Sequence, residues 1–596
     1  MVAQPAPSTA RVLLPLTLVV LLLGAYLNAL NNPFLIDDAS IVVEHPHVNS
    51  AAGLTQLWTS DYWAGMGEDP NLYRPMTVLS LNLNSLITGY APNPLAFRLV
   101  NILLLAVLAW VIKLYVSEFT HYGVGWLAGL LVAMHPANTE LVDYIVGRSD
   151  LLAMIGIVGF AYNQKRAYRA ETWSAKHILA AAGCAALAMG AKETGLAVLP
   201  VAVAQMWLFG PRKSSSMHAT ALLVVAVPAV LYLFGRIEAV GWTVSYAGGS
   251  DDLTGNPLRD VDHADRVPAA AAIAWFYFKQ IFITDTSFNH IPETLPTWRS
   301  GSALVGALGL VIIVCATVMT LVRRIWLAVP LLISVVQYVL VGNLFVPSGI
   351  YAANRLMLPF LLVAACVLAV IIERFTKGSR RRRAVATIPV AAVVVWFGVS
   401  VVYANFDWQS QLRRMQADAE RHPISPVACY WYGIALHEVG DHAGAIDWLR
   451  QAVKRAPESI QARQSLINVY NHKDVKNWTG IRNQAAAILE RYPQNLDALR
   501  ALGVACMHLG DPHGAQTHLT LAQQIRPNDR EVASNLAKLE HQLNPTTVEG
   551  LINRLMLEIE AGRLDQAQAL CQRLLEMEPN SFIAHRYLGA IALQRD

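Results

Sequence analysis

Charged residues are scarce in this sequence. Asp, Glu, Lys and Arg make up 15% of its 596 residues, whereas hydrophobic residues make up 54%. An ordinary soluble protein has about 25% charged residues, so this composition excludes that class. The formal net charge is only +4, and no basic domain typical of nucleic-acid binding stands out. We therefore expect no nucleic-acid partner.

Cysteine is also rare, with six residues scattered along the chain. No pair has the spacing of a zinc site, and the set does not resemble a disulfide framework. The short loops between apolar segments lack a phosphate-binding glycine-rich loop. Nothing in the sequence requires a bound cofactor.

Long apolar runs dominate the first two thirds of the chain. A helix of about twenty residues crosses a hydrocarbon layer about 30 Å thick. The first run follows Arg11 as a signal peptide would, but it stays apolar through Leu27, which favours a retained anchor. The sequence predicts about eleven spans, near residues 12–30, 98–117, 124–140, 144–163, 177–190, 194–209, 217–236, 302–322, 326–346, 350–373 and 384–404.

Basic residues indicate which side of the membrane each loop occupies, because short Lys/Arg-rich loops are cytoplasmic. Four clusters fall on one side if the N-terminus is cytoplasmic and residues 269–283 do not cross. That segment is fifteen residues long and carries Lys279, so we expect a re-entrant or interfacial helix. Outer loops are then expected at 31–97 and 237–300, with everything after residue 405 outside the cytoplasm. The clusters are at 165–169, 212–213, 323–324 and 374–383.

The last third of the chain repeats itself. Glycine, a Gly–Asp pair and proline recur at a spacing of 70 residues, about two tetratricopeptide (TPR) periods of ~34 residues. The sequence predicts a membrane domain over 1–405, a linker over 406–425 and a TPR α-solenoid over 426–596. Such an array binds peptides or helices in a concave groove; a rigid spacer or oligomerisation arm is the alternative. Examples are Gly433, Gly440 and Pro457 against Gly503, Gly510 and Pro527.

Two adjacent carboxylates, Asp37 and Asp38, follow the first predicted span directly. Carboxylates at a membrane boundary are costly to desolvate, so one of the pair is expected to have a raised pKa. Such a group can accept a proton from a hydroxyl. A solvated loop and an N-cap for the next helix are the alternative interpretations.

Further polar residues lie near the predicted outer ends of other spans. An arginine at this interface can pair bidentately with a lipid phosphate. Singly, each residue also fits an interhelical salt bridge or an interfacial anchor. Together they favour a lipid-phosphate substrate in an outer cavity. They are His135, Glu140, Arg148, Asp150, Lys192, Glu193, Asn354 and Arg355.

Several motifs follow one another in a recognisable order. They are FLIDDASIVVEHPHV, the stretch from Trp58 to Asn84 with Tyr73–Arg74–Pro75, HPANTELVDYIVGRSDLLA, AKETGLAVLPV, NPLRDVDHADRV followed by ITDTSFNHIP, and NRLMLP. This order, together with the repeats, resembles the TMTC family, membrane O-mannosyltransferases of the GT-C superfamily that carry C-terminal TPRs. The resemblance covers nearly the whole chain. In the last motif Asn354 precedes Arg355 where the family usually has Glu, and Met357 replaces a tyrosine.

The resemblance implies an all-α, polytopic GT-C-type bundle with its active site in the first outer loop, facing the periplasm or ER lumen. It also implies a polyprenyl- or dolichyl-phosphate sugar donor, with mannose as the sugar. Asp37 and Asp38 match the acidic pair, one of them acting as general base. The arginines of the matching motifs, Arg74, Arg148 and Arg355, are expected to bind donor phosphate. Tyr73, Asp285 and His290 lie in these motifs and complete the candidate site.

The reaction expected is a single inverting displacement onto Ser/Thr hydroxyls of exported proteins. Phosphate is a good leaving group, so arginine charge can suffice without a general acid. No cofactor is required, and a divalent ion on the acidic pair is the alternative. We expect a multi-pass protein of a bacterial inner membrane, with site and repeats on the periplasmic side and the repeats recruiting the acceptor. A GT-C enzyme acting on a lipid or polysaccharide, and a non-catalytic TPR scaffold, are the competing functions.

Overall fold

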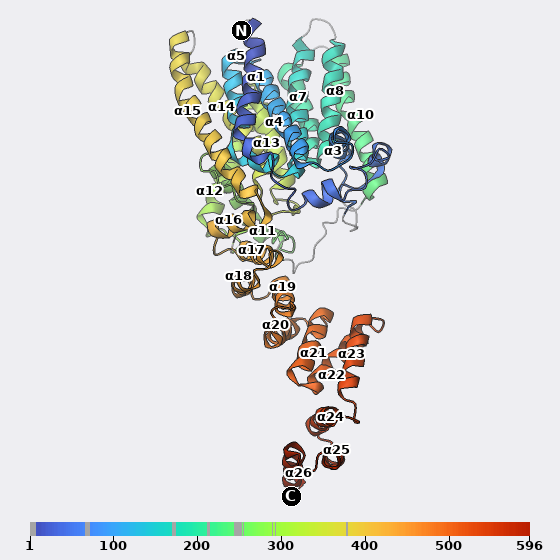
Figure 1. Cartoon of the computed structure of the whole chain (residues 1–596). Coiled ribbons are helices and arrows are strands. Elements are labelled where there is room, and N and C mark those ends of the chain that lie inside the picture. Colours follow the sequence, from blue (N-terminus) through green and yellow to red (C-terminus); the bar gives the residue numbers. More distant parts are fainter. Residues whose placement is uncertain are drawn as a thin grey trace. The chain divides into compact units, whose positions relative to one another are not determined.

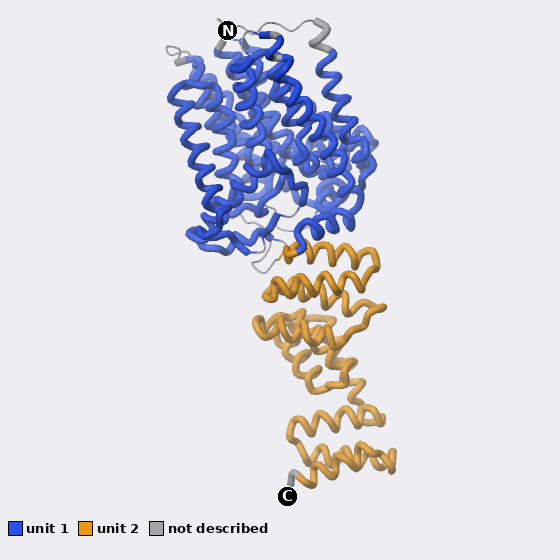
Figure 2. The backbone as a smooth tube through the Cα atoms, turned by 90° about the vertical axis from the view of Figure 1, so that its left-hand side faces the viewer, with its two compact units in different colours: residues 1–250, 254–423 blue, residues 251–253, 424–596 orange. Residues whose placement is uncertain are grey.

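The computed structural model describes residues 8–65, 72–169, 174–210, 215–242, 253, 255–288, 290–292, 294–376 and 379–595. All regular structure in these ranges is helical, which confirms the all-α prediction. The chain forms two compact units, residues 1–250 with 254–423 and residues 251–253 with 424–596, coloured separately in Figure 2.

The long helices of the first unit run alongside one another as a bundle (Figure 1). Each of the eleven predicted spans contains one of them. Among the described residues, six helices are long and apolar enough to cross a membrane, which fits a membrane protein; the count of eleven spans stays a prediction. The eleven helices are α1 (Ser8–Ala25), α4 (Pro94–Val116), α5 (Tyr122–Ala133), α7 (Arg148–Arg169), α8 (Ala175–Ala191), α9 (Val198–Phe209), α10 (Ser215–Val240), α12 (Gly301–Val322), α13 (Ala328–Val341), α14 (Leu358–Thr376) and α15 (Arg380–Asn405).

Several predicted spans are shorter as helices because short turns replace their outer ends. The segment predicted at 124–140 ends as a helix at Ala133. His135 is extended (φ −66°, ψ 132°), as expected for a residue that precedes a proline. Four candidate site residues lie in these turns: Glu140, Glu193, Asn354 and Arg355. The turns comprise the 3₁₀ helices η4 (Pro136–Asn138), η5 (Ile145–Gly147), η6 (Glu193–Ala197) and η7 (Asn354–Met357), and the one-turn helix α6 (Thr139–Val142).

The first outer segment is built from short helices. After α1 come η1 (Leu27–Ala29) and the π-type turn η2 (Ala39–Val43). The next elements are α2 (Gly53–Gln56), η3 (Leu57–Thr59) and the longer α3 (Pro75–Ile87). Buried side chains of this segment pack with Tyr144, Ile145 and Trp408 into a small core of their own. The acidic pair therefore belongs to a folded layer at the end of the bundle.

Helix α11 (His263–Gln280) contains most of the segment predicted not to cross. Its first turn and its last residue both hydrogen-bond to the segment between α13 and α14. Arg266 Nη2 donates to the Phe345 carbonyl (3.1 Å), and Gln280 Nε2 donates to Asn354 Oδ1 (2.8 Å). Gly306 of α12 permits the close packing of α11 and α12. A Cβ added at this position would lie 1.8 Å from the Ala271 carbonyl oxygen of α11. Both ends of α11 thus contact the segment between α13 and α14, and its re-entrant or interfacial placement stays a prediction.

The described basic clusters lie at the helix ends opposite the candidate site. Lys165 and Arg166, near the end of α7, pair with Glu118 at 2.8 and 3.3 Å. The Arg324 guanidinium lies over the Trp207 ring, 4.3 Å from its centroid. Arg374 lies in the last turn of α14, and Arg355 precedes the first turn of this helix. The predicted cluster at 212–213 and Lys377 lie outside the described residues. This polarity is the one that the positive-inside rule requires for a site on the outer face.

The second unit consists of paired helices. The TPR prediction is confirmed by the repeat geometry and by a family match given below. Gly440 and Gly510 adopt positive φ (86° and 75°) at equivalent turns, a conformation that costs little only for glycine. The helices are α17 (Pro426–Glu438), α18 (His442–Arg455), α19 (Ile460–Asn471), α20 (Trp478–Arg491), α21 (Leu496–Leu509), α22 (Pro512–Ile525), α23 (Arg530–Gln542), α24 (Val548–Glu560), α25 (Leu564–Met577) and α26 (Phe582–Arg595).

Small residues and prolines act in these repeats as their positions predict. A Cβ at Gly433 would lie 2.8 Å from Leu449, and one at Gly503 2.6 Å from Leu519, so both glycines permit close helix pairing. The four repeat prolines each lie two residues beyond the end of a helix, where proline cannot continue it. They are Pro457, Pro493, Pro527 and Pro579.

The segment predicted as a linker is folded instead. It forms η8 (Phe406–Trp408) and α16 (Gln411–Arg421) inside the first unit. Its composition looks like a solvated linker, but Trp408 is buried and Arg414 is paired with Asp407 and Asp418. Ion pairing lets an arginine-rich helix be buried. The boundary between the units consequently falls at residues 423–424.

Candidate active site

The loop after α1 buries one carboxylate of the acidic pair. Asp38 is fully buried, and its two oxygens accept hydrogen bonds from the backbone N–H groups of Leu35 (3.4 Å) and Val146 (3.2 Å). Burial raises the pKa of Asp38 to about 8, and the Arg98 charge opposes this shift. Its carboxylate makes no N-cap hydrogen bond to η2. Both alternatives, a solvated loop and a helix cap, are therefore wrong for Asp38.

Asp37 is the accessible carboxylate of the pair. It is half-buried, and its Oδ2 accepts a hydrogen bond from the Tyr144 hydroxyl. Burial raises the pKa of Asp37, whereas the Tyr144 hydrogen bond and the Arg355 charge lower it. A partly accessible carboxylate held by a phenol is suited to accept a proton from an incoming hydroxyl. Of the two predicted bases, Asp37 is the more accessible.

Arg355 contacts Tyr144, the hydrogen-bond partner of Asp37, and also pairs with Glu140. Its guanidinium lies over the Tyr144 ring, 5.4 Å from the centroid, and its Nη1 donates to Glu140 Oε1. Glu140 also accepts the Arg355 backbone N–H at 3.2 Å. Arg355 and Asp150 line one small cavity of about 10 Å³. Within the described residues only Nη1 of this guanidinium is hydrogen-bonded, so Nε and Nη2 remain available as donors.

More nitrogens of the Arg74 guanidinium are hydrogen-bonded than of the Arg355 guanidinium. Arg74 Nε and Nη2 donate to the two oxygens of Glu193 at 3.2 and 2.9 Å, a bidentate pair. Its guanidinium also lies over the Tyr62 ring at 4.8 Å. The neighbouring Tyr73 hydroxyl donates to the Trp58 carbonyl at 2.8 Å. Arg74 lies at the candidate site but offers fewer free donors than Arg355.

Lys192 and Asp150 form a buried ion pair at 2.7 Å. Their side chains are 9% and 8% exposed, so removal of either charge would leave the other buried without its partner. Asp150 also lines the cavity beside Arg355. The pair thus adjoins the site and has a structural role.

The side chains of Arg148 and His135 are engaged in contacts with other residues of the fold. All three nitrogens of the Arg148 guanidinium donate, to Asn101 and Asn84 side chains and to the Ser80 and Phe97 carbonyls. His135 Nδ1 accepts from the Ala137 backbone, and its ring packs on Phe397 at 4.7 Å. Both residues are buried. Arg148 therefore holds the base of the site together and presents no donor to a phosphate.

Asn354 and Asp285 organise the loop after α11. Asn354 Nδ2 donates to the carbonyls of Asp285 (2.9 Å) and Ser287 (3.0 Å). This loop carries Phe288, whose ring packs edge-on against Tyr144 at 5.6 Å. His290 lies further along the same loop, against Phe276 at 4.4 Å. The loop thus supports the tyrosine that contacts Asp37, without itself reaching the carboxylate.

Sequence reasoning missed Tyr144 and its neighbour Asp143. Asp143 is fully buried, and its Oδ1 accepts from Asn32 Nδ2 at 2.9 Å. Burial raises the pKa of Asp143 to about 7, opposed by the Arg98 charge. Both residues stand in a quoted motif, but Asp143 is one more acid between two predicted spans and Tyr144 is the first residue of a predicted span. Only their contact with the first outer segment identifies them.

The raised pKa values of Asp38 and Asp143 predict how stability depends on pH. An acid whose folded-state pKa is raised binds its proton more tightly in the folded chain, so stability falls as pH rises from about 4 towards 7 to 8. The Asp143→Asn variant cannot ionise and should lose part of this dependence. Melting temperatures of the purified chain at pH 5 and pH 8.5 test this. An equal drop for the wild type and the variant would contradict it.

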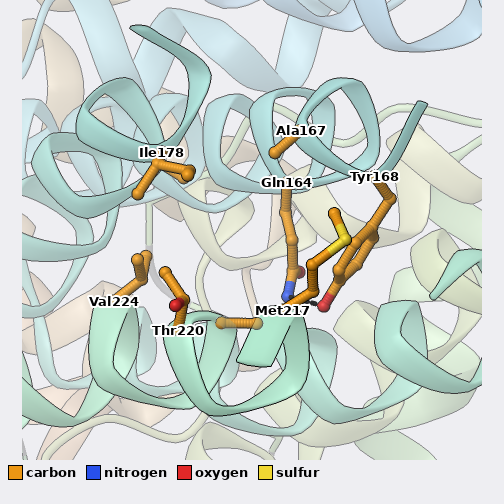
Figure 3. A pocket seen from close by; sticks show the side chains of 9 residues that line it. Gln164, Ala167, Tyr168, Ile178, Met217, Thr220 and Val224 are labelled. Atoms are coloured by element: carbon orange, nitrogen blue, oxygen red, sulfur yellow. Dashed lines mark hydrogen bonds between the residues drawn. The ribbon is translucent and has the colours of Figure 1, made fainter. Parts of the chain in front are cut away.

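A second cavity lies away from these groups. It lies between α7, α8 and α10, has a volume of about 30 Å³, and is lined mainly by apolar side chains. Figure 3 shows the Met217 side chain beside Gln164 and Tyr168, with Thr220 and Val224 further away. This volume holds about one water molecule, and the cavity lies near the end of α7 opposite Arg148. None of its lining residues carries a charge that could bind a phosphate.

Comparisons with known proteins agree with the two-part architecture. The tetratricopeptide-repeat family matches residues 411–460 and 554–596. Protein O-mannosyl-transferase TMTC3 of Mus musculus is 22% identical over 617 residues, covering 95% of this chain and 64% of the mouse protein.

Local identity to other relatives is higher. Protein O-mannosyl-transferase Tmtc1 of Drosophila melanogaster is 33% identical over 178 residues, which are 29% of this chain and 20% of that protein. Protein O-mannosyl-transferase TMTC1 of Homo sapiens is 34% identical over 207 residues, 32% of this chain and 23% of that protein. The chain spans less than two thirds of the length of these curated relatives.

Proposed function

We infer that this chain, a relative of the TMTC proteins along most of its length, is a membrane protein O-mannosyltransferase. It moves mannose from a polyprenyl-phosphate donor to Ser/Thr hydroxyls of exported proteins. The observation that carries the proposal is the Asp37–Tyr144–Arg355 arrangement, in which a partly accessible carboxylate and a guanidinium with free donors flank one tyrosine ring. A base beside a phosphate-binding cation is what sugar transfer from a lipid phosphate requires.

The proposed reaction uses these residues as follows. Asp37 takes the proton of the acceptor hydroxyl as its oxygen attacks the anomeric carbon. The bond from that carbon to the phosphate oxygen breaks, and the lipid phosphate leaves with the electron pair. Arg355 stabilises the developing phosphate charge through Nε and Nη2. A single displacement of this kind inverts the anomeric configuration, as in a GT-C enzyme.

The site is proposed to face away from the cytoplasm. Its residues lie at helix ends opposite Lys165, Arg166 and Arg324, and the positive-inside rule assigns those basic residues to the cytoplasm. In a bacterial inner membrane, the site and the repeats then lie in the periplasm. This supports an acceptor that is an exported protein.

The repeats are proposed to recruit that acceptor. All candidate site residues precede residue 360, whereas the TPR unit carries none of them. TPR arrays bind extended segments of partner proteins. Recruitment by the repeats explains why a protein-binding unit accompanies a sugar-transfer site.

Mass spectrometry of exported proteins in three strains tests the function. The strains lack the chain, produce it in full, or produce a form ending at Pro423, which keeps α16 with the membrane unit. We expect hexose on Ser/Thr residues only with the full chain, and strongly reduced occupancy with the truncated form. Identical modification in all three strains would refute the proposal, and full occupancy with the truncated form would refute recruitment alone.

A further inference from the structure

Two histidines and an aspartate from distant parts of the first unit meet beside the candidate site. Asp285 and His290 belong to the loop after α11, and His422 follows α16 directly. One potential ligand atom from each residue lies within 4.8 Å of the others. His422 Nε2 is 3.0 Å from Asp285 Oδ2, across a separation of 137 residues. Neighbouring ligands of a tetrahedral zinc ion are about 3.4 Å apart, given metal–ligand distances of about 2.1 Å.

His290 supplies an independent indication of a ligand. Its Nε2 is buried and finds no hydrogen-bond partner among the residues that the structure describes. A buried polar atom without a partner is costly, and such an atom commonly binds a water molecule or an ion. The Phe276 ring packs against the imidazole at 4.4 Å and fixes its position.

We propose that Asp285, His290 and His422 bind a zinc-class divalent metal ion that fastens the α11–α12 loop to the end of α16. Two imidazoles and one carboxylate are ligands typical of zinc, whereas magnesium prefers oxygen ligands alone. Ser287 Oγ, 3.1 Å from His422 Nε2, is placed to ligate the ion or to hydrogen-bond a water in the fourth position.

The ion would support the catalytic geometry from outside it. The fastened loop carries Phe288, which packs on Tyr144, and its backbone accepts the hydrogen bonds of Asn354 beside Arg355. Phe288 N–H also donates to Asp418 of α16 at 3.0 Å. The ion thus reinforces an existing contact between loop and helix. The metal ion would position the loop and take no part in sugar transfer, because none of the three residues that bind it contacts Asp37.

The repeat unit contains a weaker candidate that any test must remove. His442, His472 and Asp474 also lie within ligand distance of one another. There the Asp474 side chain is 64% exposed, and His442 already contacts His437 through their Nδ1 atoms at 2.9 Å. No buried atom of this cluster lacks a partner among the described residues. A His442→Ala background removes its contribution.

Zinc binding by the purified full chain tests the proposal. In the His442→Ala background, chelator-treated protein reloaded with Zn²⁺ should bind one ion per chain by elemental analysis, and Co²⁺ should give the absorption of a tetrahedral site. His422→Gln can keep the hydrogen bond to Asp285 but should reduce zinc affinity at least tenfold; His290→Ala should do the same. The matched control is His177→Ala, which alters a half-buried histidine away from the cluster.

Three outcomes would overturn the metal site. They are no zinc above the background, zinc retained in the His290→Ala/His422→Gln double variant, and equal affinity for Mg²⁺ and Zn²⁺. Because the measurement is binding, it stands apart from sugar transfer. An inactive chain that binds zinc as described would refute the proposed function and leave the metal site intact.

Discussion

Replacement of Asp37 by asparagine is expected to reduce sugar transfer by about 100- to 10,000-fold, the usual cost of losing a general base. Asparagine is nearly isosteric and can still accept the Tyr144 hydroxyl hydrogen bond through its amide oxygen. The chain should therefore fold normally and bind donor lipid with unchanged affinity. Single-turnover transfer to a Ser/Thr peptide, measured with donor bound beforehand, isolates the chemical step.

Two further variants show whether the effect belongs to Asp37. Asp38→Asn should lower the melting temperature, because one backbone N–H loses its acceptor, and should slow transfer less than Asp37→Asn. The exposed Asp260→Asn, in the second outer segment, should change neither quantity. Near-normal transfer by Asp37→Asn, or a larger loss in Asp38→Asn at full folding, would assign the base elsewhere.

Replacement of Arg355 by lysine is expected to weaken donor binding by about 10- to 100-fold, the range for a lost charged hydrogen bond. Lysine keeps the charge opposite Glu140, whose side chain is 3% exposed, so the fold should persist. It loses Nε and Nη2, the donors that could hold a phosphate bidentately. Arg355→Ala is less informative because it leaves Glu140 buried without its partner.

Donor affinity can be measured by titrating the purified chain with a fluorescent polyprenyl phosphate. The control is Arg324→Lys, which alters an arginine at the opposite end of the bundle, beside Trp207, and should leave donor affinity unchanged. If Arg355→Lys binds donor as tightly as the wild type, Arg355 is only the partner of Glu140, and Arg74 becomes the next residue to test.

Periodicity and short motifs predict much of this fold. Runs of apolar residues identified eleven helices of the bundle because a membrane helix must be apolar along its length. A recurrent Gly–Asp pair identified the TPR unit, since Gly440 and Gly510 occupy turns that need positive φ. The acidic pair was found because adjacent charges at the end of an apolar run are costly unless they serve a purpose.

Tertiary contacts explain what the sequence could not reveal. Nothing local separates Asp37 from Asp38; the difference arises because Val146, over a hundred residues away, donates its N–H to Asp38. Helix α16 has the composition of a solvated linker. Arg414 can be buried in it because the guanidinium forms ion pairs. His422 and Asp285 are likewise 137 residues apart, beyond the reach of any spacing rule for metal ligands.

Transfer by the purified chain itself tests the central claim most directly. The protein, reconstituted in lipid vesicles with polyprenyl-phosphate mannose, is mixed with a Ser/Thr-containing acceptor and followed by mass spectrometry. The account predicts that the acceptor gains one hexose on a hydroxyl, with inverted anomeric configuration, and that Asp37→Asn abolishes this gain. Failure of the folded, donor-bound wild-type chain to modify any hydroxyl acceptor, or equal transfer by Asp37→Asn, would contradict it.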